Sequence, residues 1–198
     1  MNEVGDISDK RGLQGLVERA RAAGENEAHR PLPPVHLWNP NVCGDIDILI
    51  RRDGTWLHEG AVISRPELVR LFSTVLRRDA DGVFLVTPVE KLRIRVEDAP
   101  FRAVRVDLRG DVLVFTTNMG DEVIAGPDHL IRVETDPVSG APAPYVHVRH
   151  GLEARIDRAV FYELVALAQE REAPDGVELG VWSARLFFPL GPAGAHLI

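Results

Sequence analysis

The sequence has a single cysteine, Cys43, among 198 residues, so an internal disulfide framework and a zinc site built from several cysteines are both excluded. It has no apolar run close to the ~20 residues that a membrane-spanning helix needs. Its first thirty residues are polar and charged and lack the apolar core of a secretory signal. We therefore expect a cytoplasmic protein that does not enter a membrane.

Lysine is nearly missing as well, because 21 of the 23 basic residues are arginine and only Lys10 and Lys91 are lysine. The formal net charge is −7, which argues against non-specific nucleic-acid binding. Hydrophobic residues make up 45% and charged residues 27%, as in ordinary globular domains. The length suits one large or two small domains.

Recognised catalytic motifs are absent too. The sequence has no glycine-flanked nucleophilic serine, no zinc-protease helix and no kinase signature. The polar turn at residues 116–121 lacks the repeated glycines and the lysine of a phosphate-binding loop. We therefore predict no catalytic residue and no metal site, and the sequence identifies no cofactor.

The N-terminal residues 1–32 differ in composition from the rest. Apolar spacing predicts a helix over residues 9–23 with Ser8 as its cap, followed by a polar, proline-bearing linker. From Cys43 onward, alternating apolar and polar residues predict strands, for example at Ile46, Ile48 and Ile50.

Two segments of the remaining chain resemble each other. The apolar stripe after Ile63-Ser64-Arg65, where Ser64 and Glu67 form a candidate capping box, matches the stripe after Ile156-Asp157-Arg158. This match predicts a repeated unit of hairpin, helix and returning strand. We predict an α+β protein with duplicated hairpin-helix-strand units around antiparallel sheets: residues 33–98, residues 99–190 and a tail at 191–198.

The densest polar cluster lies at residues 36–47. Its His36, Cys43, Asp45 and Asp47 offer metal ligands, but no pair has a recognised ligand spacing. Cys43 would need a histidine partner to act as a nucleophile, and the aspartate pair could do acid–base work. The structural interpretation, in which Cys43 is a small buried side chain and the aspartates lie on a solvated face, is favoured by these residues alone.

Four arginines, Arg93, Arg95, Arg105 and Arg109, lie on the polar faces of predicted strands. They could hold a phosphate through their guanidinium groups. Because acidic residues are interspersed among them, a salt-bridged, solvated face is the favoured interpretation.

Several motifs together resemble the uncharacterised bacterial domain-of-unknown-function family 1285, over about residues 33–190. They are HLWNP at 36–40, CGDID at 43–47, DGTW at 53–56, LFSTVL at 71–76, FLVTPVEK at 84–91, VEDAPF at 96–101, PYV at 144–146 and RHGLEA at 149–154. The resemblance implies a duplicated α+β fold whose C-terminal half is loosely similar to pleckstrin-homology-like domains.

The resemblance also implies a function. It suggests a small ligand, nucleotide-like or a phosphorylated metabolite, that is held between the two halves and serves signal transduction. The candidate ligand-contacting residues are Cys43, Asp45, Asp47, Glu90, Lys91, Asn118 and Asp121.

Three functions thus remain open. The first is a cytoplasmic, non-enzymatic binding module for a small ligand. The second is an enzyme that uses Cys43 or the Asp45/Asp47 pair. The third is a protein–protein adaptor, which the loose pleckstrin-like similarity suggests.

Overall fold

The structure is a computed structural model that describes residues 5–24, 32–136, 140–174 and 176–194. The chain divides into two compact units. The first contains Met1–Arg51 and Thr55–Glu97, and the second contains Arg52–Gly54 and Asp98–Ile198. Among the described residues, no helix is long and apolar enough to cross a membrane.

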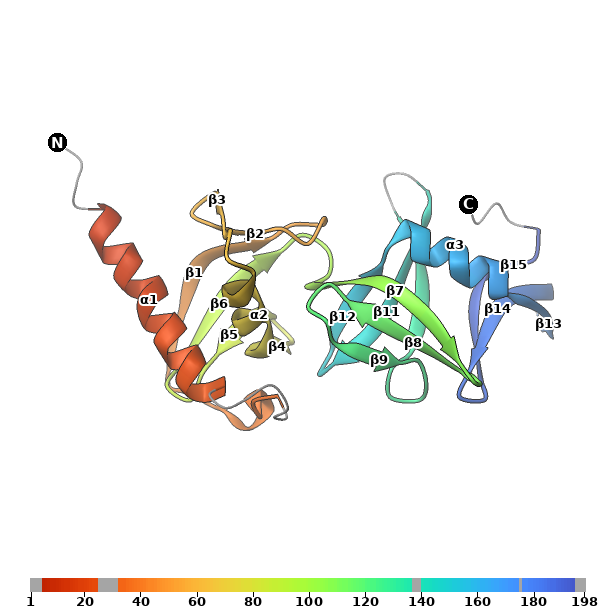
Figure 1. Ribbon diagram of the computed structural model, residues 1–198, viewed down its shortest axis with the longest axis horizontal. Helices are drawn as coiled ribbons and strands as arrows, with labels where there is room; N and C mark the ends of the chain where they lie inside the picture. Colours follow the sequence, from red (N-terminus) through yellow and green to blue (C-terminus); the bar gives the residue numbers. More distant parts are fainter. Residues whose placement is uncertain (1–4, 25–31, 137–139, 175, 195–198) are drawn as a thin grey trace. The chain divides into compact units, whose positions relative to one another are not determined.

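The first unit contains a six-stranded sheet in the order β3-β2-β1-β6-β5-β4 (Figure 1). Its strands are β1 (Val42–Ile50), β2 (Trp56–His58), β3 (Ala61–Val62), β4 (Leu76–Asp79), β5 (Gly82–Val86) and β6 (Glu90–Val96). Its helices are α1 (Gly5–Gly24), the 3-10 turn η1 (Val35–Leu37) and α2 (Pro66–Thr74). The predicted N-terminal helix is confirmed as α1, which contacts α2 and buries Leu16 and Ala20. The predicted cap is wrong, because α1 begins at Gly5 and Ser8 lies within the helix.

The second unit contains a six-stranded sheet in the order β10-β11-β12-β7-β8-β9 and a three-stranded sheet in the order β13-β14-β15. The first of these sheets consists of β7 (Phe101–Arg109), β8 (Val112–Thr117), β9 (Glu122–Ile124), β10 (Ile131–Thr135), β11 (Pro142–Arg149) and β12 (Leu152–Ile156). They are followed by α3 (Arg158–Leu167), β13 (Gln169–Ala173), β14 (Gly176–Ser183) and β15 (Leu186–Pro192).

The predicted duplication is confirmed, and it is visible in the strand order. When β1 to β6 are matched with β7 to β12, the two curled sheets have the same order of neighbours (Figure 1). In each sheet the strand that comes first in the sequence lies at the centre and pairs in parallel with the strand that comes last, β1 with β6 and β7 with β12. The other pairings within these sheets are antiparallel, so each sheet combines four antiparallel pairings with one parallel pairing.

The two helices that revealed the repeat do not occupy equivalent places. Helix α2 lies between the third and fourth strands of its unit, whereas α3 follows the sixth strand of the other unit. Amphipathic helices share an apolar spacing wherever they occur, so their similarity does not report the strand pairing that defines the repeat. The strands carry the correspondence between the two units.

The predicted cap of α2 is wrong. Arg65, not Ser64, is the N-cap residue, and no side chain of the described residues caps this helix end. Pro66 occupies the first turn as expected, since its fixed φ suits that position.

Each unit has its own apolar core. In the first unit Trp56 stacks on Phe72 with ring centroids 6.4 Å apart, and both side chains are buried. In the second unit Phe101, Phe115 and Leu152 are fully buried. The cores hold the strands in register and so fix the positions of the polar side chains that the sheets carry.

Candidate functional site

Five of the seven residues predicted to contact a ligand lie in the first unit, on β1 and β6. Cys43 and Lys91 are register partners on these parallel strands. Cys43 is exposed, and its Sγ lies 4.0 Å from the carbonyl oxygen of Pro40. The structural interpretation of Cys43 as a buried side chain is therefore wrong.

The two aspartates of β1 are exposed and ion-paired. Asp45 has a side chain that is 83% exposed and lies 3.7 Å from Arg93. Asp47 is 51% exposed and pairs with Arg95. Both carboxylates are open to water.

Glu90 and Lys91 also have protein partners. Glu90 accepts a hydrogen bond from Nε of Arg19 in α1, and Lys91 pairs with Asp79. Arg77 pairs with the same aspartate. Burial raises the pKa of Asp79, but hydrogen bonds from Lys91 and Arg77 outweigh it and hold that pKa below its usual value.

Asn118 and Asp121 lie in the second unit, between β8 and β9. The side-chain oxygen of Asn118 accepts from the backbone N–H of Arg102 at 3.0 Å, and the Asn118 N–H donates to the Arg102 carbonyl at 2.8 Å. Asp121 pairs with Arg149 at 3.1 Å. Asn118 thus braces Arg102, which lines the cavity described next.

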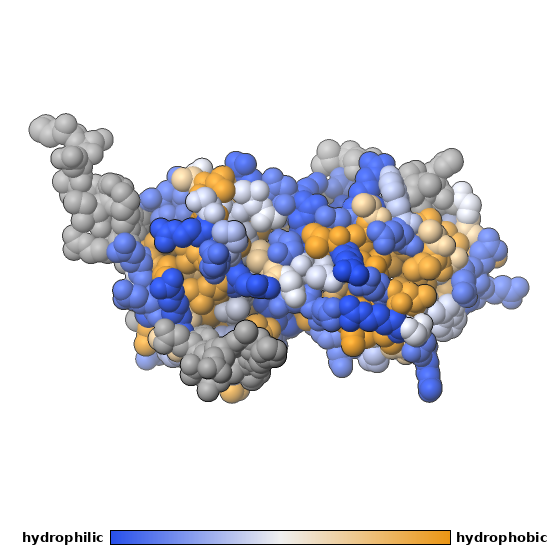
Figure 2. Space-filling model, in the orientation of Figure 1, coloured by the Kyte–Doolittle hydropathy of each residue, from blue (hydrophilic) through white to orange (hydrophobic). Residues whose placement is uncertain are grey.

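The arginines of the predicted polar stripe are ion-paired. Arg105 pairs with Asp107, and Arg109 pairs with Glu122. Figure 2 shows hydrophobic and hydrophilic residues interleaved on the visible face of the second unit. This arrangement matches the salt-bridged, solvated face that the sequence favours.

A cavity of ≈ 490 Å³ opens in the second unit and brings together side chains far apart in the sequence. We call it the arginine-lined cavity. It is lined by Arg52, Asp53, Arg102, Ala141, Pro142, Pro144, Arg155, Ile156, Asp157, Arg158, Phe161 and Tyr162. Its size lies in the range of about 300–1,000 Å³ that is typical of small-molecule sites.

Strand register positions two of these arginines. Arg155 of β12 is the register partner of Arg102 on β7 and of Tyr145 on β11. Side chains at paired positions lie on the same face of a sheet. Arg102, Arg155 and Tyr145 therefore form a row across three strands.

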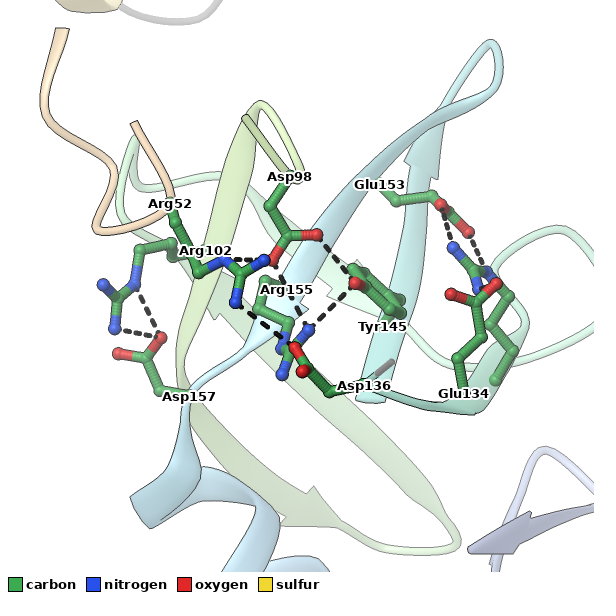
Figure 3. A network of polar contacts seen from close by, with 10 residues as sticks. Arg52, Asp98, Arg102, Glu134, Asp136, Tyr145, Glu153, Arg155 and Asp157 are labelled. Carbon is green, nitrogen blue, oxygen red and sulfur yellow. Dashed lines mark hydrogen bonds and ion pairs between the residues drawn. The ribbon is translucent and has the colours of Figure 1, made fainter. Parts of the chain in front are cut away.

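Each guanidinium of the row has a carboxylate partner (Figure 3). Arg102 places Nε and Nη2 2.7 Å from the same oxygen of Asp157. Arg155 donates from Nη1 to the Tyr145 hydroxyl at 2.9 Å and to Asp98 at 3.4 Å. The hydroxyl in turn donates to Asp98 at 2.7 Å.

Arg52 joins this network from the connection between β1 and β2. It lies 3.2 Å from Asp136 and 3.9 Å from Asp98, whose side chains are only 9% and 10% exposed. Its own side chain is 61% exposed. Arg52 thus neutralises two buried carboxylates while it remains open to solvent at the cavity.

Burial raises the pKa of the Tyr145 phenol, and the neighbouring Asp98 raises it further. The ring lies between two guanidinium groups, with Arg155 at 5.0 Å and Arg132 at 4.3 Å from its centroid. Arg132 makes two hydrogen bonds to Glu153, which raises the pKa of its guanidinium. Tyr145 is therefore held as a neutral donor and acceptor.

The arginines retain hydrogen-bonding capacity. A guanidinium carries five N–H donors. Within the described residues, Nη1 of Arg102 and both Nε and Nη2 of Arg155 have no hydrogen-bond partner. Arg158 donates from Nε to the hydroxyl of Tyr162. The cavity wall thus offers several charged donors to an anion.

Sequence reasoning missed the lining residues. Arg102 and Asp157 pair over 55 positions of sequence, and this contact depends on the parallel register of β7 and β12. The local signals were motifs: DGTW and PYV contain the lining residues Asp53 and Pro144, and VEDAPF and RHGLEA contain Asp98 and Glu153 of the neighbouring ion pairs. Among the described residues, no group of three or more His, Cys, Asp or Glu side chains is arranged to hold a metal ion.

Comparison with known families finds two matches that together span most of the chain. "Domain of unknown function (DUF1285), N-terminal domain" matches residues 33–99. "Protein of unknown function (DUF1285), C-terminal domain" matches residues 100–190. The resemblance inferred from the sequence motifs is thus confirmed.

Two solved structures are similar to this chain. A DUF1285 family protein from Silicibacter pomeroyi DSS-3 is 50% identical, with a TM-score of 0.80, over 90% of this chain and 96% of that chain. A DUF1285 family protein from Shewanella baltica OS155 is 27% identical, with a TM-score of 0.49, over 60% of this chain and 90% of that chain. No curated protein matches the sequence.

Proposed function

Because the chain belongs to the DUF1285 family, whose domains are described as of unknown function, we propose a function from the geometry of its second unit. The protein is a binding module for a small anionic ligand, held in the arginine-lined cavity. The ligand class is a phosphorylated metabolite or a nucleotide-like molecule. A sensing role in cytoplasmic signalling, which the family resemblance suggests, is part of this proposal.

The observation that carries the proposal is the charge of the cavity wall. Four arginines and two aspartates line one cavity, although the chain as a whole has a formal net charge of −7. The lining residues therefore carry a local excess of positive charge, which attracts anions even on an acidic protein. Guanidinium groups are the side chains best suited to paired hydrogen bonds with phosphate or carboxylate oxygens.

The rest of the wall suits the uncharged part of such a ligand. Pro142, Pro144 and Ile156 supply aliphatic surface, and Phe161 and Tyr162 supply aromatic rings. A flat, partly apolar body beside the anionic group would contact these side chains. The earlier hypothesis of a ligand between the two halves stays a prediction, since the present proposal concerns a cavity within the second unit.

A thermal-shift screen of the full chain tests the proposal. The probes are inorganic phosphate, sugar phosphates and nucleoside monophosphates, and each organic phosphate is compared with its unphosphorylated counterpart. A ligand that binds only the folded state adds about 2.7 kcal/mol of stability at a hundredfold excess over Kd. We expect a shift with phosphorylated probes and none with the unphosphorylated counterparts.

Two arginine variants define the site. Arg102→Gln should abolish the shift, because Arg102 lines the cavity. Arg109→Gln is the matched control, since Arg109 has the same charge and lies on the same strand but pairs with Glu122 on the exposed face. Calorimetric titration at a fixed temperature separates lost binding from lost stability. A flat screen, or an equal loss in both variants, would reject the proposal and favour the adaptor function.

A further inference from the structure

Asp157 occupies the N-cap position of α3 without acting as a cap. Its backbone has φ −63° and ψ 149°, the extended conformation of an N-cap residue, and its carbonyl accepts the first helical bond from Phe161 at 2.8 Å. Aspartate is among the preferred N-cap residues because its carboxylate accepts an N–H of the first turn. Within the described structure, however, no side-chain hydrogen bond caps α3.

The carboxylate is engaged by Arg102 instead. Nε and Nη2 of Arg102 both lie 2.7 Å from one Asp157 oxygen. Both side chains are largely buried, at 29% and 23% exposure, and both line the arginine-lined cavity. The two donors that this pair occupies are therefore donors that an anionic ligand would use.

The first turn of α3 offers the carboxylate a second position. The amides of Ala159 and Val160 stand at the second and third helical positions, where an N-cap side chain normally accepts. The backbone of Asp157 already has the conformation that capping requires, so a side-chain rotation alone exchanges one partner for the other.

We propose that Asp157 is a displaceable counter-ion that sets the anion affinity of the cavity. An incoming anion takes the Nε and Nη2 donors of Arg102, and the released carboxylate rotates to cap α3 at Val160. The new cap offsets part of the cost of breaking the Arg102–Asp157 pair. This inference rests on the proposed function, because it requires an anion at the same site.

The exchange predicts the effect of removing the charge. Asparagine and serine cap helices about as well as aspartate, but neither neutralises Arg102. Asp157→Asn and Asp157→Ser should therefore bind inorganic phosphate roughly tenfold more tightly than the natural chain, because the competing anion is gone. Glu178→Gln is the control for the change in net charge, since Glu178 pairs with Arg171 on the exposed β13–β14 ladder.

The test combines two measurements on the full chain. Calorimetric titration with inorganic phosphate gives the affinity of each variant. Amide NMR spectra and hydrogen exchange at Ala159 and Val160 report the cap, which inorganic phosphate should induce in the natural chain. In Asp157→Asn these amides should already be capped without phosphate and change little when it is added.

The outcomes separate the two ideas. Tighter binding in both Asp157 variants, unchanged binding in Glu178→Gln and a phosphate-induced change at Val160 support the displaceable counter-ion. Binding to the natural chain with no gain in Asp157→Asn, or with no change at Val160, overturns it and leaves the proposed function intact. Failure of every variant to bind any anionic probe overturns both.

Discussion

Arg102 and Arg155 are register partners on the parallel strands β7 and β12, so two positive charges lie side by side on one face of the sheet. Like charges at paired strand positions destabilise a sheet unless anions compensate them. Asp157 beside Arg102 and Asp98 beside Arg155 supply that compensation. The second unit therefore pairs these arginines internally, and an external anion has to compete with the protein's own carboxylates.

Tyr145 allows a direct optical test of this network, because the chain has only two tyrosines. Tyr145 is 7% exposed and hydrogen-bonded to Asp98, whereas Tyr162 is 38% exposed. Burial first, and then Asp98, raises the Tyr145 pKa, so we expect an ultraviolet titration in which the phenol lost in Tyr145→Phe ionises above the normal range. An unchanged upper transition in Tyr145→Phe would contradict this assignment.

The same pKa shift predicts how stability depends on alkaline pH. A group whose folded-state pKa is raised stabilises the fold below its unfolded value, here 10.0, and loses that contribution as the pH rises through the folded value. Tyr145→Phe should cost about 1–2 kcal/mol at pH 7, since it leaves Asp98 without one donor. In urea unfolding, this deficit should shrink above pH 10.

The strands were easier to predict from the sequence than the site. Alternation at Ile46, Ile48 and Ile50 predicts β1 because each strand has one buried face, which is a local property. The register pairing of Arg102 with Arg155 depends on which strands become neighbours in the sheet, and no local sequence pattern encodes that pairing. The sequence therefore predicts the elements and the duplication but not the cavity.

The candidate residues illustrate the same limit. The family resemblance implies a ligand contact for Asn118, and the structure places this residue against the backbone of Arg102, which lines the cavity. Lys91 belongs to one of the family motifs, and its side chain pairs with Asp79 in the first unit. Residue type and motif indicate that a side chain is constrained, but not whether its partner is a ligand or another part of the protein.

Gly54 packs against Arg102, which lines the cavity, and against Asn118, and this packing gives a test of stability. Gly54 has φ +84°, and an added Cβ would lie 3.0 Å from Cδ of Arg102 and 3.1 Å from Nδ2 of Asn118. Gly54→Ala should cost about 1–2 kcal/mol for the left-handed backbone and about 1–3 kcal/mol more for the crowding. It should also weaken phosphate binding, because Arg102 must shift.

Gly110→Ala is the matched control. Gly110 also has a positive φ, +65°, but an added Cβ there would meet nothing within 4 Å. Gly110→Ala should lower the free energy of unfolding only by the cost of the left-handed backbone, and it should leave phosphate binding unchanged. Equal losses of stability in urea unfolding of the two variants would show that crowding at Arg102 contributes nothing.

Ser183 fastens the terminal three-stranded sheet to the larger sheet of the second unit. Its fully buried hydroxyl accepts from the Leu113 N–H at 2.8 Å and donates to the Ala125 carbonyl at 2.7 Å. Ser183→Ala should destabilise the second unit by about 2–4 kcal/mol, since each buried polar group left without a partner costs about 1–3 kcal/mol. Chemical denaturation measures the loss.

Thr74→Ala serves as the comparison for Ser183→Ala. The Thr74 hydroxyl donates to the Leu71 carbonyl at 2.7 Å within α2, where the hydrogen bond is only partly buried. Removal of the hydroxyl therefore does not leave two buried polar groups without partners. This variant should lose less than about 1 kcal/mol, as is usual for such local side-chain bonds. A similar loss in both variants would contradict the fastening role of Ser183.

The lowered pKa of Asp79 predicts that the stability of the first unit falls at acid pH. Burial opposes its ionisation, but Lys91 and Arg77 outweigh burial and lower its pKa below the usual 3.8. A group with a depressed folded-state pKa stabilises the fold above its unfolded value and loses that contribution as the pH falls through the folded value. Asp79→Asn should therefore be less stable than the natural chain at pH 7, by about 1 kcal/mol or less for a partly exposed pair.

The difference between these two chains should narrow in urea unfolding as the pH is lowered from 7 to below 3.8. The reason is that the natural carboxylate becomes protonated and then resembles the amide. Asp81→Asn is the control, since Asp81 pairs with Arg93 through a side chain that is 59% exposed and so contributes little. A constant difference across this pH range would mean that Asp79 stabilises the fold by packing or orientation of Arg77 rather than by its charge.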